Sequence, residues 1–490
     1  MTSTDILEKY DMTIGIECHV QLATDTKLFS GADNDARGKS PNSVVSPIDF
    51  GLPGMLPVLN RAAVDLAIKA GKALNAPIAK VSRFDRKHYF YPDLPKGYQT
   101  TQMYDPIIQA GYIDAPLEDG SMVRVRIHHA HMEEDAGKLS HYGNYSLVDL
   151  NRAGTPLIEI VSEPDIHSAA AAKAYATELY RLMTFAGVTH GDLYNGNMRF
   201  DVNLSVAPKG ATELGKRAEV KNLNSFRSVE KAAEYEFHRQ VALLERGESI
   251  VQETRGWDDV KQVTNSQRSK EDAQDYRYMP DADIPPIVLT DQEIADIQAT
   301  VPRLPNEWRV LLQSIGLDSL QTETLLDAEN EYRKTLSLLD MVEASSTSPE
   351  KAKFIALWHV NTFVPLLRDE SFTATSIDYA DLITQLYDLT KAAKLSSNSA
   401  KAVFIELAGS SELPDVESYA TEKGYIQESD EGAIAAIVDE VLADPASAKA
   451  IADIKAGNDK VIGFLVGQIM KKSQGKANPA LAQKLIRERL

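Results

Sequence analysis

Two polar residues on one predicted strand are the first candidates for chemistry. Residues 14–22 alternate strictly between apolar and polar side chains, so Glu17 and His19 point from one face of a strand and Cys18 from the other. A carboxylate beside an imidazole can bind a divalent cation or move protons. Cys18, on the apolar face, is expected to be a buried and unreactive thiol.

Further carboxylates fall in three other segments. Glu134 lies in the acidic segment 131–138, where like charges repel unless cations neutralise them. Asp201 and Glu219 point outward from two alternating stretches that could pair as antiparallel strands. If these segments share one sheet, the set that would suit Mg²⁺ is Glu17, His19, Glu134, Asp201 and Glu219. For each residue taken alone, a solvated charged surface is the favoured interpretation, and it is the set as a whole that points to a metal site.

A basic and aromatic segment at residues 86–102 is a candidate nucleotide or RNA contact. Lys87, Tyr89 and Tyr91 lie close together there, before a proline turn. Aromatic rings can stack on a base and a lysine can bind phosphate. A rigid loop with buried tyrosine rings is the alternative, and composition alone slightly favours it.

Residues 210–217 come close to a P-loop but fail its requirements. Arg217 stands where that motif needs Ser or Thr for Mg²⁺, and the following residues alternate like a strand instead of beginning a helix. We therefore expect a hairpin loop here, and any nucleotide must be bound by another architecture. No Gly-x-Ser-x-Gly elbow or other nucleophile arrangement stands out in the sequence.

The C-terminal end is basic within an acidic chain. Seven Lys and Arg residues face one Glu between Lys460 and Leu490. This asymmetry favours contact with RNA phosphates, with Lys471, Lys472 and Lys476 as the candidates. Lysines that offset a helix macrodipole are the alternative explanation.

These candidates require a mixed α+β first half. Ser168 and Ser228 are expected to begin helices there, and residues 60–75 carry a helical apolar stripe. The proline-rich segment 279–286 separates this part from an acidic, helical remainder. We expect an α+β fold on an antiparallel sheet with flanking helices, then an all-α domain and a small helical tail, with bounds of 1–290, 291–410 and 411–490.

Composition limits the class of protein. Fifty-two basic and 71 acidic residues give a net charge of −19, which excludes general coating of DNA. A single cysteine cannot form an internal disulfide or a Cys-rich zinc site. Because there is no basic-then-apolar leader and no apolar run of about 20 residues, we expect a cytoplasmic protein without membrane contact.

Taken together, the segments resemble the B-subunit family of the tRNA-dependent amidotransferases, which convert Glu-tRNA(Gln) or Asp-tRNA(Asn) to the correct aminoacyl-tRNA. Any one segment could arise elsewhere, but the ordered set is specific. The resemblance is carried by residues 14–22, 89–99, 131–138, 148–161, 221–226, 275–279 and 463–470.

The resemblance implies a cradle domain that binds ATP and Mg²⁺ and holds the charged 3′ end of tRNA. It implies catalytic roles for Glu17, His19, Glu134 and Lys87, and it adds Asp201 and Glu219 to the metal ligands. Lys87, Tyr89, Tyr91 and Arg152 would bind ATP or substrate, and the helical and tail domains would meet tRNA. Some relatives hold zinc just after the first strand, but residues 27–34 contain no cysteine, so we expect no zinc.

The implied activity is that of a ligase (EC 6.3.5.-): ATP-dependent amidation through an acyl phosphate, with either mischarged tRNA as substrate. Ammonia would come from a glutaminase, the A subunit, with a small C subunit to complete a heterotrimer. Two alternatives remain open: a non-catalytic scaffold that binds tRNA, and a metal-dependent phosphohydrolase.

Overall fold

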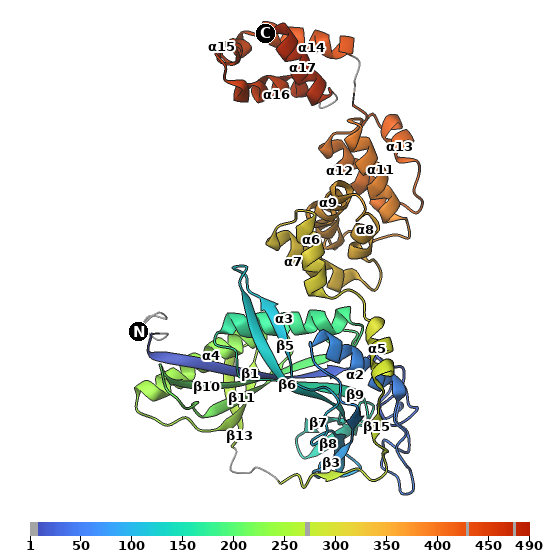
Figure 1. The fold of residues 1–490 in the computed structure, drawn as a ribbon, viewed down its shortest axis with the longest axis vertical. Helices are drawn as coiled ribbons and strands as arrows, with labels where there is room; N and C mark the ends of the chain where they lie inside the picture. Colours follow the sequence, from blue (N-terminus) through green and yellow to red (C-terminus); the bar gives the residue numbers. More distant parts are fainter. Residues whose placement is uncertain (1–7, 270–274, 428–430, 474–476) are drawn as a thin grey trace. The chain divides into compact units, whose positions relative to one another are not determined.

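The computed structural model describes residues 8–269, 275–427, 431–473 and 477–490. The chain divides into two compact units, Met1–Glu307 and Trp308–Leu490 (Figure 1). A mainly antiparallel sheet with helices forms the first unit and helices form the second, so the predicted α+β class is confirmed. The domain bounds drawn from the sequence at 290 and 410 stay predictions.

An eight-stranded sheet forms the centre of the first unit, in the order β13-β12-β11-β10-β1-β9-β6-β5 (Figure 1). All neighbours are antiparallel except β11 and β12, which are parallel. The strands are β1 (Tyr10–Gln21), β5 (Gly111–Pro116), β6 (Met122–Glu134), β9 (Pro156–Ser162), β10 (Met198–Pro208), β11 (Arg217–Leu223), β12 (Glu253–Asp258) and β13 (Val263–Ser269).

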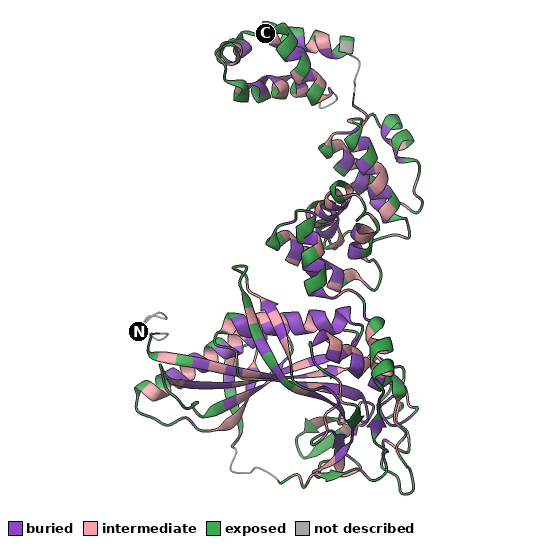
Figure 2. Ribbon diagram, in the orientation of Figure 1, coloured by how far each residue is buried: buried purple, intermediate pink, exposed green. Residues whose placement is uncertain are grey.

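One face of this sheet is apolar and covered by helices. Ile14, Ile16 and Cys18 on β1 are buried, and α3 (Ala169–Phe185) and α4 (Phe226–Glu245) lie over this face (Figures 1 and 2). Burial raises the pKa of the Cys18 thiol well above its usual value, so the predicted buried, inert cysteine is confirmed. The polar residues of β1 therefore point from the opposite face.

Several predicted boundaries are confirmed, and one is wrong. Ser168 caps α3 as expected, and the predicted pair β10 and β11 is antiparallel, with residues 209–216 as its loop. Ser228, however, does not begin α4. The N-cap is Ser225, whose backbone is extended and whose hydroxyl oxygen accepts a hydrogen bond from the amide of Ser228 at 3.0 Å. The Ser228 hydroxyl instead donates to Asp259 at 2.9 Å.

Short elements surround the sheet. The helix α2 (Arg61–Ala73) begins after the N-cap Asn60, within the predicted range 60–75. The strands β3 and β4 form a hairpin that carries Lys87 on β3 and Lys96 in the connecting loop. The remaining elements of this unit are β2 (Val81–Ser82), β3 (Asp85–His88), β4 (Tyr98–Thr101), β7 (Lys138–Tyr142), β8 (Tyr145–Asp149), β14 (Met279–Pro280), β15 (Ile287–Val288) and α5 (Asp291–Ala299).

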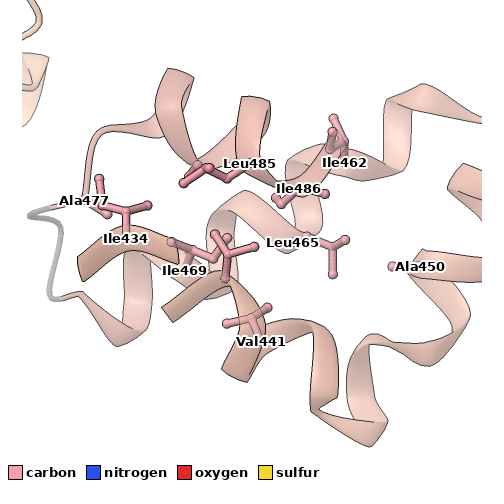
Figure 3. Close-up of a cluster of buried hydrophobic side chains, with 11 residues drawn as sticks. Ile434, Val441, Ala450, Ile462, Leu465, Ile469, Ala477, Leu485 and Ile486 are labelled. Carbon is pink, nitrogen blue, oxygen red and sulfur yellow. The ribbon is translucent and has the colours of Figure 1, made fainter. Parts of the chain in front are cut away.

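The rest of the described chain is helical. Its main helices are α6 (Pro305–Ser314), α7 (Ser319–Tyr332), α8 (Leu338–Ala344), α9 (Pro349–Trp358), α11 (Tyr379–Lys391), α12 (Ser397–Ala408), α13 (Val416–Glu422), α14 (Glu431–Ala443), α15 (Ala448–Lys455), α16 (Ile462–Lys472) and α17 (Pro479–Arg489). Ile434, Leu465, Ile469 and Ile486 form a buried core among α14, α16 and α17 (Figure 3). Among the described residues, no helix combines the length and apolarity that crossing a membrane requires.

A buried histidine makes the second unit sensitive to acid. Neither ring nitrogen of His359 has a hydrogen-bond partner among the described residues, and burial lowers its pKa from 6.5 to about 3. The unfolded chain therefore takes up a proton below pH 6.5 that the folded chain does not.

We expect the contribution of His359 to the free energy of unfolding to be complete above its unfolded pKa. It should fall by about 1.4 kcal/mol for each pH unit below that value, down to the folded pKa. Denaturant melts of the full chain at several pH values should show this slope, and His359→Leu should flatten it. Parallel curves for the two proteins would contradict the assignment.

Candidate active site

Three carboxylates meet on the uncovered face of the sheet. Glu17 on β1 lies directly opposite Asp201 on β10. Glu219 on β11 lies opposite Asn203, which is two residues after Asp201 on β10 and points from the same face. One oxygen from each of the three carboxylates lies within 4.8 Å of the others. We call Glu17, Asp201 and Glu219 the carboxylate group. The structure thus brings together three of the five predicted metal ligands.

One lysine partly neutralises the carboxylate group. Lys221 Nζ lies 3.0 Å from both Asp201 Oδ2 and Glu219 Oε1. Glu17 accepts a hydrogen bond from Asn203 at 3.0 Å but forms no ion pair with Lys221 among the described contacts. Burial, together with the charges of Glu159, Glu219 and Asp201, raises the pKa of Glu17.

This donor set fits a divalent cation. Three carboxylates face one ammonium group, so negative charge remains uncompensated in a half-buried place. Carboxylate oxygens are the ligands that Mg²⁺ prefers.

His19 belongs to a second group beside the first. Its Nε2 lies 3.4 Å from Glu133 Oε1 and 3.5 Å from Glu159 Oε2. The strand register brings these side chains together, because Glu159 on β9 is paired with His19 on β1 on one side and with His131 on β6 on the other. We call His19, Glu133 and Glu159 the histidine group. Glu17 and His19 are two residues apart, so the two groups lie about 7 Å from each other along β1.

The two carboxylates of the histidine group keep His19 protonated. Burial alone would lower the pKa of His19, but its hydrogen bond to Glu159 and the charges of Glu133 and Glu159 raise it to about 9. Burial would raise the pKa of Glu159, but His19, His131 and Lys87 lower it. His19 is therefore cationic at neutral pH, and a metal ion bound here would have to displace its proton.

The expectation that Glu134 joins the other ligands is wrong. Side chains alternate along β6, so Glu133 shares a face with His131 and Glu134 points the other way. The buried carboxylate of Glu134 forms an ion pair with Lys96 and accepts the amide of Thr100 at 2.9 Å. Glu134 therefore holds the β3–β4 hairpin in place and is absent from both groups.

Comparisons with known proteins extend over the whole fold. The profile of the GatB/GatE catalytic domain matches residues 12–295, and that of the GatB domain matches residues 340–490. The proteins named as the aspartyl/glutamyl-tRNA(Asn/Gln) amidotransferase B subunit from Carboxydothermus hydrogenoformans and Trichodesmium erythraeum are 43% and 42% identical to the chain. These alignments cover 99% and 100% of this chain and 99% of each relative. This chain belongs to the GatB family.

Of the four predicted substrate contacts of this GatB-family chain, Lys87 and Tyr89 lie beside the histidine group. Burial alone would lower the pKa of Lys87, but Glu133, Tyr278 and Glu159 raise it, and its Nζ lies 4.9 Å from the Tyr276 ring centroid. Burial, Asp93 and Glu133 raise the pKa of Tyr89. Lys87 and Tyr89 therefore lie beside the histidine group.

The other two predicted contacts, Tyr91 and Arg152, have different surroundings. Tyr91 is exposed on the surface. Arg152 donates to Asp135 at 2.7 Å, and Arg199 donates to the same carboxylate at 3.2 Å. Arg152 is thus tied into an ion-pair network next to Glu134, and its predicted role in binding substrate stays a prediction.

Three members of the site, Glu159, Glu133 and Lys221, were not among the residues predicted from the sequence. Glu159 is the lone acidic residue in the apolar run of β9, and that isolation was an available signal. Glu134 was chosen in place of Glu133, because the sequence does not show how far β6 extends and therefore which of the two points toward His19. Lys221 follows Glu219 by two residues and so shares its face of the strand, but only the fold shows that it contacts two carboxylates.

Of the three tail lysines predicted to contact RNA, two lie among the described residues. Lys471 is exposed in the last turn of α16, and Lys472 next to it pairs with Glu440. Lys476 lies outside the described residues. For this GatB-family chain, tRNA contact by the tail therefore stays a prediction.

Proposed function

We propose that this chain is the amidating subunit of a tRNA-dependent amidotransferase. It would convert Glu-tRNA(Gln), Asp-tRNA(Asn) or both to the amidated aminoacyl-tRNA at the expense of ATP. The observation that carries the proposal is the carboxylate group, three carboxylates close enough to share one divalent cation on the open face of a sheet. The names of the relatives support the substrate class.

The chemistry explains why a carboxylate-rich site is useful here. A carboxylate resists ammonia, because it is anionic and oxide is a poor leaving group. If its oxygen attacks the γ-phosphorus of ATP, ADP leaves and an acyl phosphate forms. The nitrogen of ammonia then attacks the carbonyl carbon, phosphate leaves, and one N–H proton passes to a base. Neither step needs a nucleophile from the protein, and positioning and charge neutralisation do most of the work.

Glu17, Asp201 and Glu219 would hold Mg²⁺. When bound, Mg²⁺ supplies positive charge that lowers the repulsion between ATP and the incoming carboxylate. Lys221, already bonded to two of these carboxylates, would keep them in place as the ion enters and leaves. Asn203 would orient Glu17 through its hydrogen bond of 3.0 Å.

The histidine group and Lys87 would serve the aminoacyl end. The ammonium of Lys87 can bind the reacting carboxylate, and the aromatic rings of Tyr89 and Tyr276 form a wall beside it. Cationic His19 adds a second positive charge close to this place. These two cations would hold an anionic substrate about 7 Å from the Mg²⁺ ligands, the distance between Glu17 and His19 along β1. Glu133 and Glu159 could alternatively accept a second cation once His19 loses its proton.

The proposal includes partner subunits. At neutral pH ammonia is mostly ammonium, so a nearby source and a sheltered route are useful. The single cysteine of this chain is buried, which fits a glutaminase activity on another polypeptide. We propose a cytoplasmic heterotrimer with a glutaminase A subunit plus a small C subunit, in which this chain binds ATP, Mg²⁺ and mischarged tRNA.

The decisive assay supplies ammonium directly to the complex, with its glutaminase inactivated by mutation. We expect amide formation on mischarged tRNA, with one ATP consumed for each amide and no turnover without the tRNA. A scaffold would bind tRNA without consuming ATP in response to it. Phosphate release without aminoacyl-tRNA would instead favour a phosphohydrolase. Either result would contradict the proposal.

A further inference from the structure

The parallel pair of strands in the described sheet lies at the carboxylate group. β11 and β12 run in the same direction, and Glu219 on β11 is paired with Thr254 on β12. Residues paired in this way point from the same face of a sheet, so the Thr254 side chain shares the uncovered face with Glu219. Thr254 is therefore a side chain of β12 that can reach the carboxylate group.

Thr254 holds one oxygen of Glu219 and Lys221 holds the other. The hydroxyl of Thr254 donates to Glu219 Oε2 at 2.9 Å, and Lys221 Nζ lies 3.0 Å from Glu219 Oε1. The last torsion of a glutamate side chain is soft, so a carboxylate held at one oxygen can still rotate. A carboxylate held at both oxygens has a single orientation.

Two shifts in strand register lie at the same place. The pairing of β12 with β13 shifts between Thr254 and Arg255, and the pairing of β10 with β11 shifts between Phe200 and Val202, which flank Asp201. Shifts of this kind are frequent beside active sites, where they change the direction of a side chain. The irregular pairing and the parallel strands thus coincide at the carboxylate group.

The residue after Thr254 anchors β12 to the opposite face of the sheet. Arg255 is buried, and its guanidinium donates to the hydroxyl and carbonyl oxygens of Thr264 on β13, each at 2.8 Å. Arg255 also lies 3.5 Å from the carboxylate of Glu236 on α4, which is completely buried. Because neighbours along a strand point to opposite faces, this anchor also fixes the direction of Thr254.

We propose that Thr254 is a positioning residue for the divalent cation and acts through Glu219. A cation at Oε1 would share that oxygen with Lys221, whereas the hydroxyl of Thr254 occupies Oε2 and can stay bonded when the cation binds. Groups that hydrogen-bond to metal ligands typically change metal affinity by about 10- to 100-fold. The inference rests on the proposed function, because that function assigns a cation to the carboxylate group.

Thr254→Val tests the hydroxyl. Valine has the branched shape of threonine and suits a strand, so the fold should be kept. Electron paramagnetic resonance measures Mn²⁺ binding to the assembled complex without ATP or tRNA. The Mn²⁺ that the Asp201→Asn, Glu219→Gln variant no longer binds is assigned to the carboxylate group. We expect the Kd of this Mn²⁺ to rise on the order of tenfold in Thr254→Val.

The Mg²⁺ dependence of amidation gives a second readout. The Mg²⁺ concentration for half-maximal amidation should rise in Thr254→Val by the same factor as the Kd for Mn²⁺. The rate at saturating Mg²⁺ should return close to that of the wild type, because the three carboxylates are all retained. A lower rate that excess Mg²⁺ does not restore would contradict a role in holding the cation.

Two further variants separate the hydroxyl from general damage. Thr254→Ser keeps the hydroxyl and should restore the affinity for Mn²⁺. Thr13→Val makes the same chemical change on the uncovered face of β1, where Thr13 has no side-chain hydrogen bond among the described contacts. This matched control should bind Mn²⁺ as the wild type does.

The outcomes distinguish this inference from the proposed function. If the wild-type complex amidates tRNA and Thr254→Val binds Mn²⁺ with unchanged affinity, Thr254 does not position the cation. Equal losses of affinity in Thr254→Val and Thr254→Ser would also overturn the inference, because the hydroxyl would not be the cause. Amidation by the wild-type complex without any divalent cation would contradict the proposed function itself.

Discussion

The double replacement Asp201→Asn with Glu219→Gln should reduce ATP-dependent amidation on the order of a thousandfold or more. It leaves Glu17 as the only carboxylate of the carboxylate group, and Lys221 then loses both of its partners. One carboxylate beside an unpaired ammonium cannot hold a divalent cation. Single-turnover amidation of mischarged tRNA with supplied ammonium measures the loss.

Binding of tRNA separates this effect from misfolding. The substituted side chains lie on the uncovered face of the sheet, so affinity for tRNA and the melting temperature should change little. Glu118→Gln with Asp119→Asn, at the exposed turn between β5 and β6, makes the same chemical change away from the site and should retain activity. Amidation by the Asp201 and Glu219 variant above a tenth of the wild-type rate would contradict the role of the carboxylate group.

Glu159→Gln should lower amidation on the order of a hundredfold. The pKa of His19 is about 9 because its hydrogen bond to Glu159 and the charges of Glu133 and Glu159 overcome the effect of burial. Without the Glu159 charge, that pKa should fall toward or below the ordinary value of 6.5. His19 would then be largely neutral at neutral pH, and the site would lose one positive charge.

Nuclear magnetic resonance of the imidazole in metal-free protein gives a direct measure of this shift. The wild-type His19 resonance should titrate near pH 9, and that of Glu159→Gln well below pH 8. Glu163→Gln, four residues further along the chain and outside the histidine group, is the matched control and should leave the titration unchanged. Equal His19 pKa values in wild type and Glu159→Gln would rule out the proposed cause.

Much of the sheet could be predicted because its strands alternate cleanly. The pattern of residues 14–22 placed Glu17 and His19 on one face, and that face is uncovered in the structure. The pairing of β10 with β11 followed from two alternating stretches separated by a loop rich in turn residues. Strict period-2 patterns survive folding because burial on one face fixes the register.

What could not be predicted depends on strand ends and on contacts far apart in sequence. The choice between Glu133 and Glu134 required knowing that β6 continues to residue 134 and pairs there with β9. The start of α4 was misplaced because Ser225 and Ser228 are both good caps, and only the backbone of Ser225 is extended. The ion pair of Lys96 with Glu134 joins the β3–β4 hairpin to β6 of the sheet. The sequence pattern around either residue does not predict this pair.

Glu17, Asp201 and Glu219 are proposed to hold the cation that ATP-dependent amidation requires. Crystals of the complex with Mn²⁺ in place of Mg²⁺ and a non-hydrolysable ATP analogue test this most directly, because Mn²⁺ has a strong anomalous signal. We expect an anomalous peak bounded by oxygens of these three carboxylates. A complex that amidates tRNA with Mn²⁺ but shows no peak there would contradict it.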